Sequence, residues 1–263
     1  MNNRKFGQLF GTRPALIGVI HLPPLPGYPA SPGIDPIVTK ALHDLEALES
    51  GPVQGVLVEN EEDRPHRVEA AKETIAAMTR VTRELVSAAR TARVGVEILL
   101  HDPEASMATA AMSGASFIRT DYFSDPMERP EYGRMRIDPE GLLRYRRSLA
   151  ADSILLLADI QVKYARMLVE RSLAESARIA VESGSDAVVV TGSRTGDAPS
   201  LADLEEARRG ANGVPVLVGS GLTASNAAAL LRVADGAIVG SSLKRGDRID
   251  AGKVKGLLEA LRR

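Results

Sequence analysis

The chain has 263 residues, of which 44% are hydrophobic and only 3% are aromatic, and its formal net charge is -1. This near-neutral charge provides no overall field that would favour nucleic acid or an anionic membrane surface as a partner. The chain contains no cysteine, which excludes disulfides, thiolate metal sites and a cysteine nucleophile. With no tryptophan, the core must be mainly aliphatic, as it is inside a parallel barrel.

The first apolar run of the chain, 15–20, follows Pro14 and is too short for a signal peptide or a membrane span. No later segment reaches the roughly 18 apolar residues that a transmembrane helix needs. We therefore expect a cytoplasmic protein without a membrane span, and weak peripheral association with a membrane stays open.

Eight short apolar runs recur along the chain, and each is rich in valine, isoleucine or leucine. Such continuous runs are typical of strands that are buried on both faces of a parallel sheet. The predicted strands are Leu16–Ile20, Gly55–Val58, Val94–Leu100, Ser116–Arg119, Ile154–Ala158, Ala187–Val190, Val214–Val218 and Ala237–Val239.

Longer segments with helical periodicity separate these runs, and several begin at an Asp-Pro pair or end at a glycine. The predicted helices span residues 36–50, 68–90, 103–113, 139–150, 170–183, 201–209, 224–232 and 249–261. Eight strand–helix units in sequence predict parallel pairing through right-handed crossovers. We expect residues 1–263 to form one domain, a single (β/α)8 TIM barrel of the ribulose-phosphate-binding type, with the barrel itself over about residues 14–261.

Two segments are longer than a minimal barrel loop. The proline-rich segment His21–Gly33 follows the first predicted strand, and the polar segment Tyr122–Arg136 follows the fourth. Both leave the carboxyl ends of strands, where TIM barrels carry their active-site loops. This position favours a functional role over surface decoration.

Glycine-rich turns follow the last two predicted strands. A glycine lets the backbone approach a ligand closely, and a turn that enters a helix directs unpaired N–H groups at it. Two such turns on neighbouring strands predict a phosphate site, whereas a single one would mean little. The phosphate-binding candidates are Gly219, Ser220, Gly221, Gly240, Ser241 and Ser242, with Gly192 from the turn after the sixth strand.

Polar side chains follow most of the other strands, and in a barrel these strand ends converge on one mouth. Carboxylates, an imidazole and a lysine at such a mouth perturb one another's pKa values, as acid–base or Schiff-base chemistry requires. The catalytic candidates are His21, Glu59, Asn60, Asp102, Asp159 and Lys163.

Alternative interpretations exist for several of these polar residues. Asp102 is also a natural helix N-cap before a proline, and Arg119 could pair structurally with Glu59 or Asp159. Lys163 could be a neutral amine that acts as base or nucleophile, or a cation held beside Asp159; we prefer the fixed cation. The remaining histidines, His43 and His66, receive no role.

No cofactor is predicted. A divalent metal held by carboxylates is conceivable, but no tight ligand spacing supports a metal site. The phosphate turns could also hold FMN, although no redox residue supports a flavin oxidoreductase. The proline-rich first loop could reach a neighbouring copy, which leaves a homodimer open.

Five motifs in this chain resemble the BtpA/SgcQ family over residues 16–243. They are the segments 20–27 (IHLPPLPG), 58–60 (VEN), 158–163 (ADIQVK), 190–192 (VTG) and 216–221 (VLVGSG). The chain departs from the family pattern at Glu97–Asp102 and at Glu61–Glu62, both near the predicted mouth. The resemblance implies a TIM barrel, and the family takes its name from a member linked to photosystem I biogenesis.

The main functional hypothesis is an enzyme that acts on a small phosphorylated substrate, either a sugar phosphate or a phosphoribosyl compound. Phosphate binding would hold the reacting end of the substrate over the barrel mouth. Isomerase, epimerase, lyase and glycosidic cleavage activities remain open. The alternatives are a non-catalytic assembly factor for a membrane complex and an FMN-binding oxidoreductase.

Overall fold

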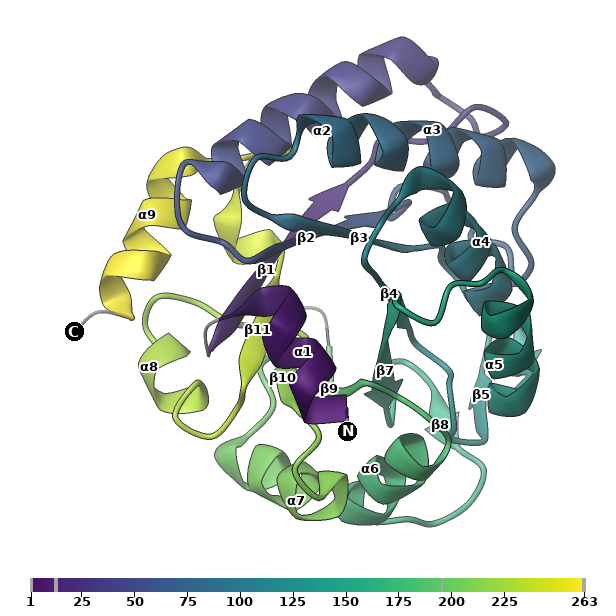
Figure 1. Cartoon of the computed structure of the whole chain (residues 1–263), viewed down its shortest axis with the longest axis vertical. Helices are drawn as coiled ribbons and strands as arrows, with labels where there is room; N and C mark the ends of the chain where they lie inside the picture. Colours follow the sequence, from purple (N-terminus) through teal and green to yellow (C-terminus); the bar gives the residue numbers. More distant parts are fainter. Residues whose placement is uncertain (1, 12–13, 195, 262–263) are drawn as a thin grey trace.

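The computed structural model describes residues 2–11, 14–194 and 196–261, and its central element is a closed parallel barrel (Figure 1). The strands follow one another around the barrel in the order β1-β11-β10-β9-β7-β4-β3-β2, so every consecutive pair along the chain is adjacent. This arrangement confirms the predicted TIM barrel. The strands are β1 (Ala15–His21), β2 (Gly55–Glu59), β3 (Arg93–Glu97), β4 (Phe117–Thr120), β7 (Leu155–Ile160), β9 (Ala187–Val190), β10 (Val216–Val218) and β11 (Gly236–Val239).

Helices cover the outside of the barrel, as Figure 1 shows. They are α2 (Ile34–Glu49), α3 (Lys72–Ala88), α4 (Pro103–Ser113), α5 (Pro139–Ser148), α6 (Leu173–Glu182), α7 (Leu201–Ala211), α8 (Ala227–Leu230) and α9 (Ala251–Ala260). The Asp-Pro signals act as the sequence predicts at α4 and α5. Asp102 and Asp138 accept hydrogen bonds from Ala105 N and Gly141 N, which satisfies N–H groups that a helix start leaves unpaired.

Several predicted elements extend beyond the observed ones, among them the third strand and the helix predicted over 224–232. The third strand ends at Glu97 rather than at residue 100, because the next two backbone N–H groups bind side chains instead of a neighbouring strand: Ile98 N donates to Ser106 Oγ and Leu99 N to Asn60 Oδ1. Helix α8 has only four residues, so most of the predicted segment 224–232 is turn.

An N-terminal helix that the sequence patterns did not predict, α1 (Asn2–Phe10), closes one end of the barrel. Figure 1 shows it lying across the centre of the ring of strands. Phe6 and Phe10 are buried in the barrel interior together with Phe117, and the Phe10 and Phe117 ring centroids are 5.4 Å apart. This helix therefore covers the amino-terminal ends of the strands, opposite the predicted active site.

The two long loops at the other end build small sheets. β5 (Met127–Arg129) and β6 (Gly133–Arg134) come from the loop after β4, and β8 (Arg166–Met167) comes from the loop after β7. They form one antiparallel sheet in the order β6-β5-β8. After β11 the chain makes a short 3-10 turn, η1 (Ser241–Leu243), and then the hairpin of β12 (Lys244–Arg245) and β13 (Arg248–Ile249).

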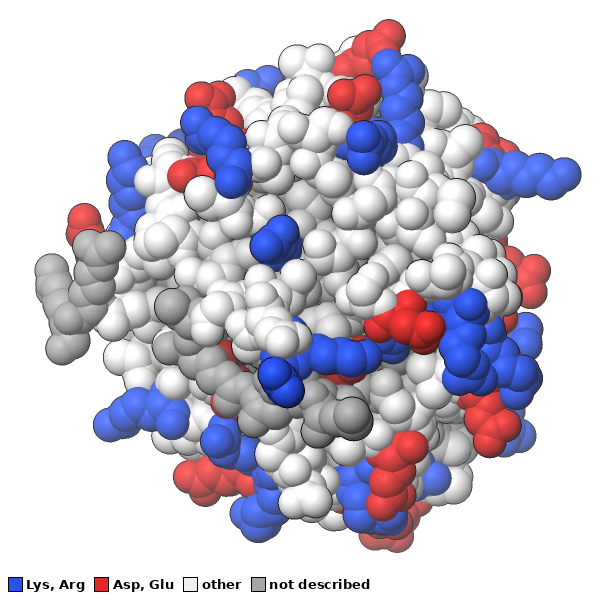
Figure 2. All heavy atoms as spheres, viewed as in Figure 1, with Lys and Arg blue, Asp and Glu red and all other residues white. Residues whose placement is uncertain are grey.

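Lysine and arginine side chains are mixed with acidic ones around the rim of the face that Figure 2 shows, the face that α1 covers. This mixture agrees with the net charge of -1. Among the helices of the described residues, none is both long enough and apolar enough to cross a bilayer.

The interior of the barrel changes from apolar to polar along the strands. Ile17 and Val19 of β1 belong to the interior apolar cluster, as do Leu155 and Leu157 of β7. Because side chains in a strand alternate between faces, the next interior positions are two residues further on. These upper interior positions are His21, Glu59, Glu97, Arg119, Asp159, Gly219 and Gly240.

Candidate functional site

Strand register places three titratable side chains in one row across the barrel mouth. His21 of β1 pairs in register with Glu59 of β2, and Glu59 pairs with Glu97 of β3. Arg119 continues the row from β4, because the preceding residues of β3 and β4 are themselves paired. Residues in register on neighbouring strands point to the same face of the sheet, so these four side chains converge.

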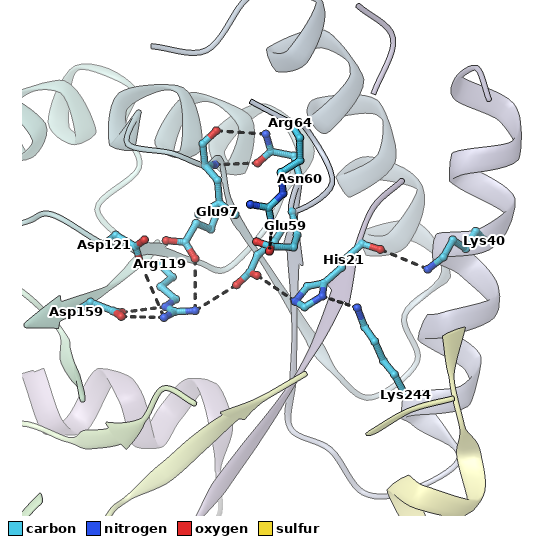
Figure 3. Close-up of polar contacts among 12 residues, drawn as sticks. His21, Lys40, Glu59, Asn60, Arg64, Glu97, Arg119, Asp121, Asp159 and Lys244 are labelled. Atoms are coloured by element: carbon cyan, nitrogen blue, oxygen red, sulfur yellow. Dashed lines mark hydrogen bonds and ion pairs between the residues drawn. The ribbon is translucent and has the colours of Figure 1, made fainter. Parts of the chain in front are cut away.

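Arg119 is the centre of this cluster, and Figure 3 shows it between carboxylates from three strands. Its Nε and Nη2 donate to the two Asp159 oxygens, each at 2.8 Å, and its Nη1 donates to Glu59 Oε1 at 3.3 Å. Glu97 Oε2 lies 3.6 Å from Nη1, and Asp121 Oδ1 lies 3.9 Å from Nη2. One buried guanidinium thus faces four carboxyl groups.

His21 links this cluster to two lysines. Its Nε2 lies 3.4 Å from Glu59 Oε2, and its Nδ1 contacts the Nζ of Lys244 (Figure 3). Lys40 Nζ donates to the His21 carbonyl oxygen at 3.3 Å and to Asp44 at 2.7 Å. The two ring nitrogens of His21 thus face a lysine on one side and the Glu59 carboxyl group on the other.

The protein environment separates the pKa values of neighbouring carboxyl groups. Burial by itself would raise the pKa of Glu59, but the contact with His21 and the charge of Arg119 lower it to about 2. Burial raises the pKa of Glu97 well above its ordinary value. The charge of Arg119 lowers this pKa, and the negative charges of Asp121, Glu59 and Asp159 offset part of that lowering. Burial also raises the pKa of Asp121, and it raises that of Asp159 to about 6.

Opposite protonation states in adjacent carboxyl groups are a recurrent feature of acid–base sites. Glu59 is ionised at neutral pH, whereas the raised pKa of Glu97 favours its protonated form. Glu97 Oε2 is buried and accepts no hydrogen bond from the residues that the structure describes. In its protonated form, this carboxyl group can donate a proton or a hydrogen bond to a bound molecule.

One cavity of about 690 Å³ joins this cluster to the glycine turns. Gly219 and Gly240 line it and occupy upper interior positions without side chains; a Cβ atom on Gly240 would lie 3.4 Å from the His21 ring. Candidate residues that line the cavity are His21, Glu59, Lys163, Gly219, Ser220, Gly221, Gly240, Ser241 and Ser242.

The two glycine turns are tied together beside the cavity. Ser242 Oγ donates to the carbonyl oxygen of Leu222 at 2.7 Å, so the turn after β11 is held against the turn after β10. Gly221 has φ +71°, a conformation that favours glycine, and a Cβ there would collide with the backbone of Ala198. Ser241 is exposed at the start of η1, where backbone N–H groups have no partner within the turn.

The structure places four of the predicted site residues away from the cavity wall. Asp159 lies behind Arg119 and is 1% exposed, which makes it a holder of that guanidinium. Asn60 donates to Asp63 and holds the backbone of residue 99, and Asp102 caps α4 and accepts from Ala70 N. The Gly192 N–H donates to Ser220 Oγ at 3.0 Å, so this contact occupies it.

Lys163 lines the cavity but is not the close partner of Asp159 that the sequence suggested. Arg119 fills that role, while the Lys163 charge still lowers the pKa values of Asp121 and Asp159. No carboxylate of the described residues 2–11, 14–194 and 196–261 forms an ion pair with Lys163. Its ammonium group thus stands at the cavity as a cation available to a ligand.

Sequence patterns gave no role to several lining residues, among them Glu97 and His66. Glu97 was treated as the interior of a longer strand, and only its place two residues beyond Gly95, on the inward face, could have suggested a role. His66, to which the sequence assigned none, is buried against the cavity, and burial lowers its pKa to about 4. Within the part of the chain that the structure describes, no three acidic or histidine side chains are arranged to hold a metal ion.

Comparison with known proteins gives both a family and a fold. The family model described as "BtpA family" matches residues 12–263. The photosystem I biogenesis protein BtpA of Synechocystis sp. is 36% identical over 97% of this chain and 90% of its own length. An Archaeoglobus fulgidus protein is also 36% identical, over 93% of this chain and 97% of its own length.

Solved structures with low sequence identity share the fold. The (S)-3-O-geranylgeranylglyceryl phosphate synthase of Thermoplasma acidophilum, in complex with sn-glycerol-1-phosphate, has a TM-score of 0.65 at 16% identity, covering 98% of this chain and 97% of the synthase. Tryptophan synthase subunit alpha of Legionella pneumophila has a TM-score of 0.63 at 12% identity, covering 99% and 98%. Because the family model matches nearly the whole chain, this protein belongs to the BtpA family.

Proposed function

We propose that the barrel is an enzyme that acts on a small phosphorylated substrate, either a sugar phosphate or a phosphoribosyl compound. The observation that carries this proposal is the shared cavity of about 690 Å³, which brings two glycine turns and a cluster of titratable groups to one space. A ligand bound at the turns would therefore have its other atoms within reach of acidic and basic side chains.

The phosphate would bind at the turns 219–223 and 240–242. Backbone N–H groups at the start of η1 and the hydroxyl groups of two serines are suitable donors to phosphate oxygens. The position after the last two barrel strands is also the usual phosphate site of this fold. The Thermoplasma acidophilum synthase, a barrel of similar shape, binds sn-glycerol-1-phosphate as a substrate, which supports a phosphorylated ligand here.

The chemistry would be proton transfer at the opposite side of the same cavity. Glu97 would donate a proton, because its raised pKa favours the protonated carboxyl group. Asp121 would accept one, because its raised pKa makes it a stronger base than an ordinary aspartate. Arg119 and Lys163 would stabilise negative charge that develops on the substrate. Isomerase, epimerase, lyase and glycosidic cleavage reactions all use such groups.

Calorimetric titration tests the phosphate site directly. The wild-type protein should bind ribose 5-phosphate and, more weakly, inorganic phosphate. Ser241→Glu places a negative charge at the turn and should weaken both by more than tenfold, while Ser241→Gln, of the same size but neutral, should bind nearly as well as wild type. The proposal would be overturned if the folded wild-type protein bound neither ribose 5-phosphate nor inorganic phosphate.

A non-catalytic role in assembly of a membrane complex is the second candidate. Its support is the 36% identity to a Synechocystis protein that is named for photosystem I biogenesis. Co-sedimentation with vesicles of anionic lipid separates the two candidates. Strong, salt-sensitive binding to vesicles, in a protein that binds no phosphorylated compound, would favour the assembly role.

A further inference from the structure

The outer wall of the cavity, opposite the glycine turns, is aromatic and cationic. Three strands separate β11 from β4 in either direction around the closed barrel, so the two strands face each other across the mouth. The loop after β4 contributes Arg129, and the loop after β7 contributes Tyr164, and both residues line the cavity. A ligand anchored at the turns would extend toward this wall.

Arg129 lies over two tyrosine rings. Its Cζ is 5.6 Å from the centroid of Tyr132 and 5.8 Å from that of Tyr164. Its Nε also donates to Glu131 at 3.4 Å, which holds the guanidinium group in place. The β5–β8 pairing brings these residues together, since it joins the loops after β4 and β7. The chain has only five tyrosines, and three of them lie in these two loops.

Tyr164 presents its ring at the cavity rim. It is 48% exposed, and among the large apolar residues that are exposed in the described chain it is the one that lines the cavity. Its φ of +64° is a left-handed conformation, uncommon for a bulky residue. Leu99 and Leu100 provide further apolar lining. Exposed aromatic rings beside a guanidinium group form a surface on which planar rings stack.

The cavity thus has three chemically different parts. The turns offer N–H and hydroxyl donors to a phosphate, and the acidic residues with His21 offer partners for hydroxyl groups. The wall of Arg129 and Tyr164 offers a flat π surface. The volume lies within the range of about 300–1,000 Å³ that is usual for drug-sized ligands.

We infer that the substrate is a pentose phosphate joined to a planar aromatic or heteroaromatic ring, and that this ring stacks on the wall of Tyr164 and Arg129. This inference rests on the proposed function and narrows it. The pentose hydroxyl groups face Glu97 and Asp121, and the phosphate lies at the turns. A sugar phosphate without a ring leaves the aromatic wall unused.

Calorimetric titration with ribose 5-phosphate, adenosine 5′-monophosphate and cytidine 5′-monophosphate tests the inference. Wild-type protein should bind at least one nucleotide about tenfold more tightly than ribose 5-phosphate, which corresponds to about 1.4 kcal/mol. Tyr164→Leu should remove that advantage and leave ribose 5-phosphate binding within about twofold, because stacking needs the ring. Tyr164→Phe keeps the ring and should retain the tighter binding of the nucleotide.

The outcomes separate this inference from the proposed function. If both nucleotides bind no more tightly than ribose 5-phosphate, or if Tyr164→Leu keeps the full advantage, the stacking wall is wrong and the phosphorylated-substrate enzyme still stands. If neither ribose 5-phosphate nor inorganic phosphate binds, the proposed function itself fails. Melting temperatures of the two Tyr164 variants confirm that each is folded.

Discussion

Arg119 and Asp159 share two hydrogen bonds of 2.8 Å in the barrel interior, although 40 residues separate them in the chain. Asp159 is 1% exposed and Arg119 is 7% exposed, so this pair is shielded from water. Arg119 also faces Glu59, Glu97 and Asp121. The guanidinium group is therefore the charge that allows several buried carboxyl groups to stand close together.

Loss of this guanidinium should destabilise the fold strongly. Arg119→Met should lower the free energy of unfolding by about 3–5 kcal/mol, the usual result of leaving buried charges without their partner. Asp159→Asn should cost less, because Arg119 keeps its other carboxylate partners. Urea denaturation at neutral pH measures both variants. Equal losses would show that Arg119 does not hold the cluster.

Glu97 should make stability fall as pH rises. Its pKa in the folded protein lies well above the ordinary value of 4.5, so the folded state keeps a proton that the unfolded state releases. Stability from this group is complete below pH 4.5 and declines between pH 4.5 and the folded pKa. Glu97→Gln removes this dependence, so its stability relative to wild type should improve as the pH rises above 4.5 in urea denaturation.

Glu59 provides the control with the opposite sign. Its pKa is lowered from 4.5 to about 2, so its contribution is present above pH 4.5 and is lost as pH falls toward 2. The stability difference between wild type and Glu59→Gln should therefore shrink on acidification. Parallel pH profiles for wild type and the Glu97→Gln variant would contradict a raised pKa of Glu97.

Lys163 should matter for ligands and not for stability. It lines the cavity and forms no ion pair with a carboxylate of the described chain, so Lys163→Ala should leave the melting temperature nearly unchanged. The variant should bind phosphorylated ligands, or turn them over, about tenfold less well or worse, a change of about 1.4 kcal/mol. Lys163→Arg keeps the positive charge and should retain most of the affinity. Wild-type affinity in the alanine variant would show that Lys163 does not contribute to ligand binding.

The N-terminal helix should stabilise the barrel from the end opposite the site. Phe10 is 4% exposed and packs edge-on against Phe117, so Phe10→Ala should lower the free energy of unfolding by about 3–5 kcal/mol. Phe10→Leu keeps more of the volume and should cost less than about 1.5 kcal/mol. Thermal or urea denaturation gives both values. A loss below about 1 kcal/mol for the alanine variant would mean that α1 is only loosely attached.

The alternation of apolar runs and helical segments was enough to determine the architecture of this protein. Continuous hydrophobicity marks a buried strand of a parallel barrel. The Asp-Pro pairs mark the starts of α4 and α5, whereas α2 begins at Ile34, before its Asp-Pro pair. The same alternation could not reveal α1, because its two phenylalanines pack on strand ends that only the closed barrel brings together. It also overestimated the length of β3, because the backbone N–H groups just beyond Glu97 donate to the side chains of Ser106 and Asn60 instead of to a neighbouring strand.

The local sequence likewise located the glycine turns and, apart from β3, the approximate strand ends, because these features depend on neighbouring residues. Which side chains share the cavity depends on strand register and on the inward or outward face of each residue, and only the tertiary structure decided that. Glu97 points into the barrel and is in register with Glu59. Asn60, the residue after Glu59, instead accepts a hydrogen bond from the backbone N–H of Leu99. Arg119 rather than Lys163 holds Asp159 because β4 pairs directly with β7 in the barrel.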